Sequence, residues 1–453
     1  MVRSRWIAGG VVCSLLLIAP SLRAADSAAA ERGRKALLGR AFNPPSWSVD
    51  AYKNVWRRWE TSTQRAPSNF SEAFLKRYGL HAAPYPNGGY PMGLREVAGL
   101  FSRGISNDCL ICHGGSIAGR SYVGLGNASL DIQALFEDLA AADGRSPRLP
   151  FTFTNVRGTS EAGAMAVFLL GWRDPDLRMR TSRAEFILRD DLCEDVPAWW
   201  LLKKKKTMYY TGSTDARSVR SLMQFMLSPL TLPSTFDREE ATFKDIQAYI
   251  LSLQPPKYPF PVNRTLAHKG EGLFVKTCAR CHGTYGEQWT YPNKIVSLDV
   301  IGTDPNRYEG ISEAFAAYYN KSWFGQEKPG WLGDDFQART TAGYQAPPLD
   351  GIWATAPYLH NGSVPTVYDL LNSAGRPQRF TRSYSTAKGA YDPVKLGWKV
   401  QILDHPADPA LPILERRKVY DTTQPGRRNS GHTFGDALAE DERMAIIEYL
   451  KTL

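Results

Sequence analysis

The stretch Lys276-Thr277-Cys278-Ala279-Arg280-Cys281-His282-Gly283 contains the pattern Cys-x-x-Cys-His, which is the attachment signal for c-type haem. The two cysteines fall on one helical turn, so both sulfur atoms can bond to the same porphyrin ring. The histidine that follows them is placed to ligate the iron from one side. The same pattern occurs earlier, as Cys109-Leu110-Ile111-Cys112-His113-Gly114. Two copies, each ending in His-Gly, predict two covalently bound haem c groups.

Residues 1–24 have the composition of a secretory signal peptide. Arg3 and Arg5 form its basic start, Ile7 to Leu22 is apolar, and Ala24 suits the last position before cleavage. Glycine and proline interrupt the apolar run, which is shorter than a membrane span, so we expect cleavage and no transmembrane segment in the mature chain. Haem is attached to Cys-x-x-Cys-His motifs outside the bacterial cytoplasm, so we expect a periplasmic or secreted protein.

The composition is that of an ordinary globular protein, with 453 residues, of which 43% are hydrophobic and 22% are charged. The formal net charge of +10 suits an acidic partner, such as a periplasmic electron-transfer protein. No segment resembles a nucleic-acid-binding module, and we expect no nucleic-acid partner.

A proline-rich segment divides the chain. Four prolines between Pro255 and Pro261 predict an extended linker over residues 255–263, between an N-terminal haem domain, 25–254, and a C-terminal haem domain, 264–453. An internal repeat supports this division, because residues 246–253 align without gaps on residues 446–453 and match at helix-face positions. We therefore predict a mainly α fold, with two cytochrome c-like helical haem domains and long irregular loops.

Local patterns predict several further elements. Residues 26–60 are polar and are expected to be irregular. A second candidate correspondence between the halves is that of Tyr209-Tyr210-Thr211-Gly212 with Leu359-His360-Asn361-Gly362. Apolar periodicity and capping residues predict helices over residues 71–78, 94–101, 130–139, 218–227, 270–278 and 440–450, and one that ends at Leu253.

The sixth iron ligand decides what each haem does. A haem with two strong protein ligands mainly transfers electrons, whereas an open position can bind dioxygen or peroxide. No histidine lies between His113 and His268, so the first haem finds no histidine ligand downstream of its motif in its own domain. His81 could reach back to it. The methionines of this region fit core positions better than an iron.

The second half offers the opposite choice. It has a single methionine, Met444, whose spacing places it on the closing helix, and it has His360, His405 and His432. His432, in a loop bracketed by glycines, is the ligand that we expect opposite His282. His405 lies in a polar loop and is expected at the surface.

With both haem motifs, the stretch Ala356-Pro357-Tyr358-Leu359-His360-Asn361-Gly362-Ser363 resembles the bacterial di-haem cytochrome c peroxidase superfamily, which includes the rubber oxygenases and the di-haem fatty-acid dioxygenases. The peroxidases of that group carry a distal glutamate in the first domain, and here Thr235 stands in its place within residues 228–236. They also use a methionine ligand that is hard to supply here. The chain is therefore most similar to the rubber oxygenase branch.

This resemblance implies roles for single residues. His113 would be the proximal ligand of an open, catalytic first haem, His282 and His432 would ligate the second haem, and His360 would lie beside a haem rather than on iron. Cys109, Cys112, Cys278 and Cys281 would hold the two porphyrins. The aromatic residues expected at the distal wall or on an electron path are Trp199, Trp200, Tyr209, Tyr210 and Phe225.

The function implied is a haem-dependent oxidoreductase that binds dioxygen and oxidises an apolar unsaturated small molecule, with the second haem as an electron-transfer centre. Two alternatives stay open. One is a hydrogen peroxide reductase in which Glu161, Glu185 or Glu194 replaces the missing acid. The other is an electron-transfer cytochrome with both irons six-coordinate. A calcium ion between the domains, as in the peroxidases, is a further cofactor for which the sequence offers no ligand cluster.

Overall fold

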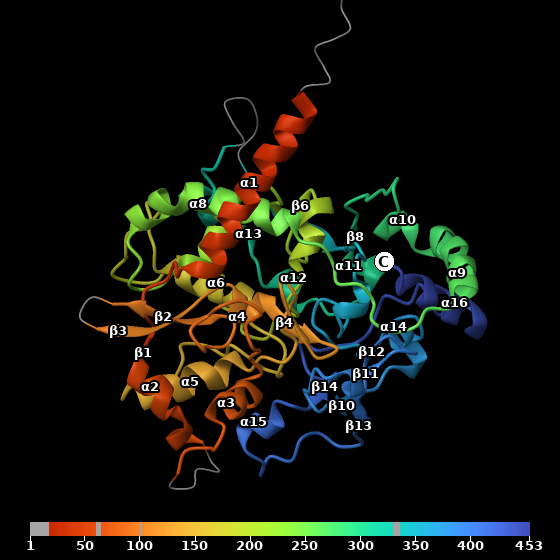
Figure 1. Ribbon diagram of the computed structural model, residues 1–453. Helices are drawn as coiled ribbons and strands as arrows, with labels where there is room; N and C mark the ends of the chain where they lie inside the picture. The colour runs from red at the N-terminus through yellow and green to blue at the C-terminus, as the bar shows by residue number, and fades with distance from the viewer. Residues whose placement is uncertain (1–17, 60–64, 100–101, 329–335) are drawn as a thin grey trace, which may run out of the picture.

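The structure is a computed structural model, and it describes residues 18–59, 65–99, 102–328 and 336–453 (Figure 1). Helix accounts for 37% of the chain and strand for 13%, so the fold is partly helical, with long loops, rather than mainly helical. The first 17 positions of the predicted signal peptide lie outside the described residues. In the parts that are described, no helix is long and apolar enough to cross a membrane.

Two pairs of packed helices frame the molecule (Figure 1). Helix α1 (Ile18–Gly39) packs along α8 (Pro233–Ser252), and α9 (Arg264–Thr277) packs along α16 (Glu440–Leu450). The first pair contains the start of the chain and the helix before the linker. The second contains the helix after the linker and the end of the chain.

Each pair crosses at a glycine. A Cβ added to Gly33 in α1 would lie 1.9 Å from the carbonyl oxygen of Asp245, and one added to Gly270 in α9 would lie 1.9 Å from that of Ala445. Asp245 and Ala445 directly precede the two aligned repeats in the sequence. The repeat therefore marks equivalent crossings, at which the two helix backbones are in contact and no side chain fits between them.

The prediction that residues 26–60 are irregular is wrong for residues 26–39, because α1 continues to Gly39. Its polar composition has a local cause. The helix exposes charged residues, some of which pair with each other, as Glu31 does with Arg34 at 2.7 Å, and it buries Gly33 and Leu37 against α8. Arg32 also pairs with Asp245 of α8 at 2.7 Å.

The prediction of a helix over residues 94–101 is also wrong, because a strand begins at Leu94. Strand β2 (Leu94–Ala98) pairs antiparallel with β3 (Arg103–Asn107), and β1 (Trp47–Ser48) pairs with the other edge of β3. The Gly99 amide also donates a hydrogen bond to the Ser102 carbonyl at 2.8 Å. Only contacts distant in the sequence distinguish this strand from a helix of similar composition.

The other predicted helices are confirmed. They are α3 (Phe70–Tyr78), α5 (Ile132–Ala142), α7 (Val219–Met223) with its 3₁₀ extension η3 (Gln224–Met226), α8, α9 and α16. The remaining elements before the linker are α2 (Val49–Asn54), η1 (Val55–Arg58), α4 (Leu110–His113), β4 (Gly114–Ile117), β5 (Arg120–Val123), α6 (Ala162–Gly171), η2 (Trp199–Lys204), β6 (Thr207–Met208) and β7 (Thr214–Asp215).

The half after the linker has shorter elements. These are α10 (Ala279–His282), β8 (Ile295–Ser297), α11 (Leu298–Ile301), α12 (Asn306–Glu309), α13 (Glu313–Lys321), β9 (Gly343–Gln345), η4 (Ile352–Ala354), α14 (Val367–Leu370), η5 (Ser373–Gly375), β10 (Arg379–Thr381), η6 (Lys388–Ala390), β11 (Tyr391–Asp392), β12 (Gly397–Trp398), β13 (Gln401–Ile402), α15 (Ile413–Arg416) and β14 (Tyr420–Asp421). Strands β13, β10 and β14 form one three-stranded sheet, and the others pair in twos.

The segment 253–263 contains no helix or strand, as expected of a linker, but it does not separate two independent cores. One apolar cluster contains Ala198 and Trp200 from before the linker together with Phe274 and Trp353 from after it. The indole nitrogen of Trp353 donates to the carbonyl oxygen of Pro256 in the linker at 2.8 Å. The two halves therefore share part of their hydrophobic core.

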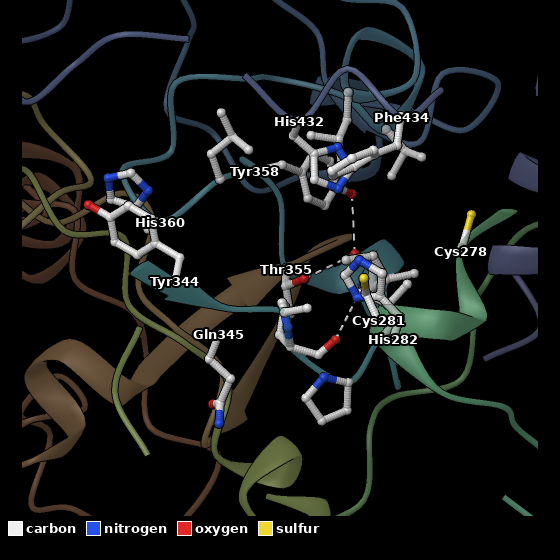
Figure 2. A pocket seen from close by; sticks show the side chains of 18 of the residues that line it. Cys278, Cys281, His282, Tyr344, Gln345, Thr355, Tyr358, His360, His432 and Phe434 are labelled. Atoms are coloured by element: carbon white, nitrogen blue, oxygen red, sulfur yellow. Dashed lines mark hydrogen bonds between the residues drawn. The ribbon is translucent and has the colours of Figure 1, made fainter. Parts of the chain in front are cut away.

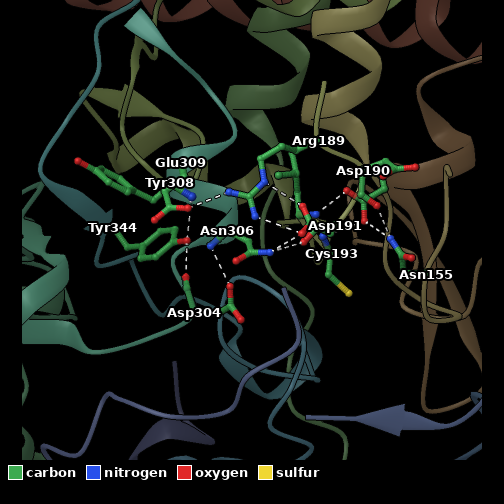
Figure 3. A network of polar contacts seen from close by, with 12 residues as sticks. Asn155, Arg189, Asp190, Asp191, Cys193, Asp304, Asn306, Tyr308, Glu309 and Tyr344 are labelled. Atoms are coloured by element: carbon green, nitrogen blue, oxygen red, sulfur yellow. Dashed lines mark hydrogen bonds and ion pairs between the residues drawn. The ribbon is translucent and has the colours of Figure 1, made fainter. Parts of the chain in front are cut away.

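A polar network adds to this contact (Figure 3). Arg189 pairs with Asp191 at 3.1 Å and with Glu309 of α12 at 2.8 Å. The amide of Asn306 donates to Asp191 at 2.8 Å, and the hydroxyl of Tyr344 donates to the Asp304 carbonyl at 2.7 Å. These bonds hold the segment before Pro197 against the loops that surround the second haem motif.

Candidate haem sites

A cavity lies beside the second haem motif, and residues from both sides of the linker enclose it (Figure 2). It has an empty volume of about 1580 Å³, part of it open to solvent, and its lining is mostly apolar. The polar, sulfur-containing and aromatic residues that line it include Asp195, Tyr210, Cys278, Cys281, His282, Thr303, Tyr344, Gln345, His360, His432 and Phe434.

The orientation of His282 is set by its backbone neighbours. Helix α9 leads into the short helix α10, which carries Cys281 and His282, and the Nδ1–H group of His282 donates to the carbonyl oxygen of Pro347 at 2.8 Å. This bond leaves Nε2 free and fixes the ring plane, as is usual for a metal-ligating histidine. Burial lowers the pKa of His282, so the ring is held in the neutral form that a metal needs.

His432 faces His282 across the cavity. The centroids of the two rings are 6.2 Å apart and the ring planes are inclined at 57°. Two imidazoles that bind opposite sides of one metal ion with bonds of about 2 Å have centroids about 6 Å apart. The pair therefore fits a haem iron with two histidine ligands, and Figure 2 shows both rings lining the same space.

The loop that carries His432 is held by its backbone. The His432 amide donates to the carbonyl of Ile301 at 2.7 Å, and a Cβ added to Gly431 would lie 2.3 Å from the carbonyl carbon of Gly302. The guanidinium of Arg376 donates to the carbonyls of Asn429, Gly431 and His432, at 2.6, 2.7 and 3.3 Å. These contacts fix the backbone of the loop that carries the His432 ring.

The two ends of the cavity differ in chemistry. Cys278 and Cys281 lie at one end, and His360 and Tyr344 lie at the other (Figure 2). Two polar atoms of the lining, Nε2 of His360 and Oγ1 of Thr303, are buried and have no hydrogen-bond partner among the described residues. An unpaired buried polar atom costs about 1–3 kcal/mol, so these atoms suit a cofactor that brings its own polar groups. A porphyrin attached at the cysteines has carboxylates on its opposite edge, and the residues fit such a group.

His360 does not face His282. Its ring stacks on Tyr344, with centroids 4.1 Å apart and planes inclined at 15°, and the edge of Tyr210 approaches it at 6.1 Å. Burial, with a smaller effect from Arg307, lowers the pKa of His360 to about 3. The structure thus places His360 and Tyr210 together at the end of the second cavity.

The first motif also lies on a short helix, but strand β3 rather than a long helix precedes it. Helix α4 carries Cys112 and His113, and the hairpin β4–β5 follows it. The ring of His113 stacks on Trp199, with centroids 4.6 Å apart. Burial lowers the pKa of His113 to about 4, and the Pro197 carbonyl opposes this effect, although Nδ1 has no hydrogen bond of normal geometry. Pro197 therefore corresponds to Pro347.

The loops after these prolines also correspond. Tyr209 follows Pro197 at the same interval as Leu359 follows Pro347. Tyr209 and Leu359 have the left-handed φ angles 66° and 65°, and each accepts a backbone hydrogen bond from the glycine three residues later, at 3.1 and 3.2 Å. The second sequence correspondence thus has a structural counterpart.

Trp200 lies away from both histidines of the motifs. It is 1% exposed, and its indole nitrogen donates to the Asp350 carbonyl at 2.8 Å within the shared apolar cluster. It does not line the second cavity. Its neighbour Trp199 contacts His113 instead.

The other candidate ligands are occupied or exposed. Nε2 of His81 lies 3.0 Å from the Asn127 side-chain oxygen, and burial lowers the pKa of His81 to about 4. His405 is at the surface, as expected. Across the described ranges, no group of three or more His, Cys, Asp or Glu side chains is arranged to hold a metal ion.

The three acidic candidates have different surroundings. Glu161 is buried and accepts hydrogen bonds from Asn155 and from the amides of Leu192 and Cys193, at 2.8–2.9 Å. Glu194 is buried and pairs with Arg307. Glu185 is exposed. Both buried carboxyl groups have partners, and burial raises the pKa of Glu161 to about 8.

Sequence reasoning missed Pro197, Pro347, Thr303 and Arg376. The equal interval from each proline to the loop with the left-handed residue is a signal that a comparison of the two halves could have found. Arg376 and Thr303 have no such signal, because they reach the site through contacts between distant segments.

Comparisons with known proteins match a segment of the second half. Residues 343–381, which contain Tyr344, Pro347 and His360, match the family described as RoxA-like, cytochrome c-like. The match supports, at a coarse level, a likeness of this segment to haem cytochromes of the rubber oxygenase type.

Two proteins of Sinorhizobium fredii are similar to this chain. The uncharacterized protein y4iM is 33% identical over 298 residues, which are 57% of this chain and 64% of that protein. The uncharacterized protein y4iJ is 30% identical over 262 residues, which are 44% of this chain and 41% of that protein. The aligned part therefore covers less than two thirds of either relative.

Proposed function

We propose that this chain is an exported di-haem c-type cytochrome that uses dioxygen to oxidise an apolar unsaturated substrate. The observation that carries the proposal is the difference between the two motifs. His282 has a second imidazole opposite it at 6.2 Å, whereas His113 has the indole of Trp199 beside it at 4.6 Å. A haem with two histidine ligands suits electron transfer, and a haem with one protein ligand has a position for dioxygen.

The residues around the first motif supply an apolar environment. Leu110 and Met92 belong to a buried cluster with Met223 and Met226 of the α7–η3 segment, and Cys109 and Trp199 pack against it. In this proposal the bound haem supplies dioxygen activation. The side chains exclude water and orient the double bond of the substrate.

Three features support the oxygenase over a peroxide reductase. Glu161 and Glu194 are already paired, Glu185 is exposed, and Thr235, at the position expected for the distal acid, is on α8. Peroxide cleavage needs an acid–base group that can move protons beside the iron. His81, the ligand that a simple electron-transfer cytochrome would use at the first haem, is bonded to Asn127.

The remaining parts of the proposal are its setting and its partners. Haem attachment and the basic, apolar start of the chain point to the periplasm or the exterior. The second haem would exchange electrons with an acidic periplasmic protein, and the linker at residues 255–263 would divide the two haem domains.

Electron paramagnetic resonance of the purified holoprotein, combined with carbon monoxide binding after reduction, tests the proposal. We expect one low-spin haem with two histidine ligands, and one haem that binds carbon monoxide. Incubation with unsaturated lipids and isoprenoids under labelled dioxygen should place label in the products, and hydrogen peroxide should not replace dioxygen. Two low-spin haems, neither of which binds carbon monoxide, would overturn the proposal.

A further inference from the structure

A second, smaller cavity lies where the two halves of the chain meet. Ala128 and residues 157–159, from before the linker, line one part of it, and residues from after the linker line the rest. It has an empty volume of about 340 Å³, part of it open to solvent. The charged residues among the described lining are Arg157 and Arg382, and this lining includes no acidic residue. We therefore call it the arginine cavity.

Both guanidinium groups of the arginine cavity pack on one tyrosine ring. The guanidinium carbon of Arg382 lies 4.2 Å from the ring centroid of Tyr384 and 4.6 Å from that of Trp398. The guanidinium carbon of Arg157 lies 5.0 Å from the Tyr384 centroid. An aromatic face attracts a cation but has no net charge, so these contacts hold the two groups in place without neutralising them.

The hydrogen bonds of the two arginines go to neutral acceptors. Nε and Nη2 of Arg157 donate to the backbone carbonyls of Ser129 and Lys76, at 2.9 and 2.7 Å, and Nη2 of Arg382 donates to that of Ala128. Burial lowers the pKa of Arg157, and it lowers the pKa of Arg382 to about 10. Both cations are thus fixed in surroundings that disfavour their charge.

Acidic side chains act on these arginines from a distance, without pairing with them in the described part of the chain. Asp131, which acts on Arg157, forms an ion pair with Arg417 at 3.2 Å. Asp195 acts on Arg382, but burial raises the pKa of Asp195 well above its usual range, which favours its uncharged form. The positive charge of the arginine cavity therefore has no direct counterion among the described side chains.

One nitrogen of Arg382 has free donors. Its Nη1 atom is buried and has no hydrogen-bond partner among the described residues. A buried donor without a partner is costly, more so when it is charged. The N–H groups of a guanidinium form a planar fork that matches two oxygen atoms of a carboxylate or a phosphate. The arginine cavity therefore offers both the charge and the donors that an oxyanion needs.

We propose that the arginine cavity binds a free small oxyanion of the phosphate or carboxylate type, held by Nη1 of Arg382 and by the charge of Arg157. This inference does not depend on the proposed function. Arg157 precedes the linker and Arg382 follows it, so the anion joins the two halves of the chain. An anion that binds the folded chain and not the unfolded one stabilises the folded chain by mass action.

Calorimetric titration of the full-length holoprotein with inorganic phosphate, at constant ionic strength, tests the proposal. The wild type should bind one phosphate, and its melting temperature should rise with phosphate concentration. Arg382→Gln should weaken phosphate binding about tenfold or more, which is the effect of one hydrogen bond to a charged group. Arg157→Gln should also weaken it, because the cavity then has one positive charge fewer.

Two variants serve as controls. Tyr384→Phe keeps the ring on which both guanidinium groups pack and removes a hydroxyl that donates to the Lys418 carbonyl at 3.3 Å. Arg416→Gln removes a positive charge at an exposed position that does not line the cavity. Both should bind phosphate as the wild type does. Circular dichroism of each variant checks that it is folded.

Three results would overturn the proposal. The first is a wild type that binds no phosphate, which is also the result if a carboxylate of a bound haem already occupies Arg382. The second is equal binding by the wild type and Arg382→Gln, which would mean an adventitious surface ion only. If Arg382→Gln does not fold, Arg382→Lys replaces it. Lysine keeps the charge but lacks the planar fork, so binding should still weaken, and undiminished binding is the third.

Discussion

The backbone amide of Asp195 donates a hydrogen bond to the carbonyl oxygen of His360 at 2.8 Å. The reciprocal bond also forms, from the Gln345 amide to the Tyr210 carbonyl at 2.7 Å. Asp195 and Gln345 each lie two residues before the proline that approaches a proximal histidine, and Tyr210 and His360 are equivalent loop positions. The two halves therefore meet through the same contact made twice, as in a two-fold symmetric dimer.

The number of covalent haems can be tested by mass. The double variants Cys109→Ser/Cys112→Ser and Cys278→Ser/Cys281→Ser should each lose one haem. A porphyrin without thioether bonds dissociates from the chain when the protein is denatured. Intact-mass spectrometry of the denatured protein measures this. Cys193→Ser is the control, since Cys193 is buried and bonded to Thr159 at 3.4 Å, and it should keep both haems. A wild-type mass with a single haem would contradict the expectation.

His432→Ala should convert one low-spin haem into a high-spin haem. The reason is that His432 is the imidazole opposite His282, at 6.2 Å between ring centroids. Electron paramagnetic resonance of the oxidised protein measures the change. His405→Ala, a substitution at an exposed position, serves as the control and should leave the spectrum unaltered. An unchanged spectrum in His432→Ala would assign the sixth ligand to another residue.

Gly270→Ala should destabilise the protein by about 1–3 kcal/mol, the usual cost of overpacking a tight contact. The added methyl group would meet the Ala445 carbonyl oxygen at 1.9 Å, so α9 and α16 would have to move apart. Gly272→Ala in the same helix is the matched control. Nothing lies within 4 Å of its Cβ, and alanine there should stabilise the helix by up to about 1 kcal/mol. Urea denaturation of the two variants gives the comparison, and equal effects would refute the crossing.

The pH dependence of stability should change when His360 is replaced by Phe. Burial lowers the pKa of His360 from 6.5 to about 3, so the unfolded chain takes up a proton that the folded state does not accept. Linkage then makes the free energy of unfolding of the wild type fall as the pH drops from about 6.5 towards about 3.

His360→Phe lacks this dependence. Its stability relative to the wild type should therefore improve by about 2–3 kcal/mol between neutral pH and about pH 4.5. Denaturation curves of both proteins at the two pH values measure the difference, in which titrations common to both cancel. A constant difference would mean that His360 titrates alike in the folded and unfolded chains.

The sequence predicts those parts of the fold that local sequence patterns determine. Helix α16 begins and ends at the predicted residues, Glu440 and Leu450, because an acidic first turn precedes a regular apolar face. The loop of His432 could be recognised from its flanking glycines. The roles of His113, His282 and His432 as iron ligands remain predictions.

The features that could not be predicted from the sequence depend on contacts between segments that are distant along the chain. Helix α1 is the counterpart of α9, but Gly270 stands close before Cys278, whereas a long insertion separates Gly33 from Cys109. The equivalence is visible only when both helices are seen against their partners. The place of Tyr210 is hidden for a related reason, since its loop belongs to the first half by sequence and lines the cavity of the second.

The glycine crossings also bear on how the protein matures. In each half the crossing joins the first long helix to the last, so the half cannot close until its final helix has been synthesised. Closure late in folding is expected where such distant segments must meet. In the exported cytochrome that we propose, the cysteine thiols would stay accessible for haem attachment until α8 or α16 docks.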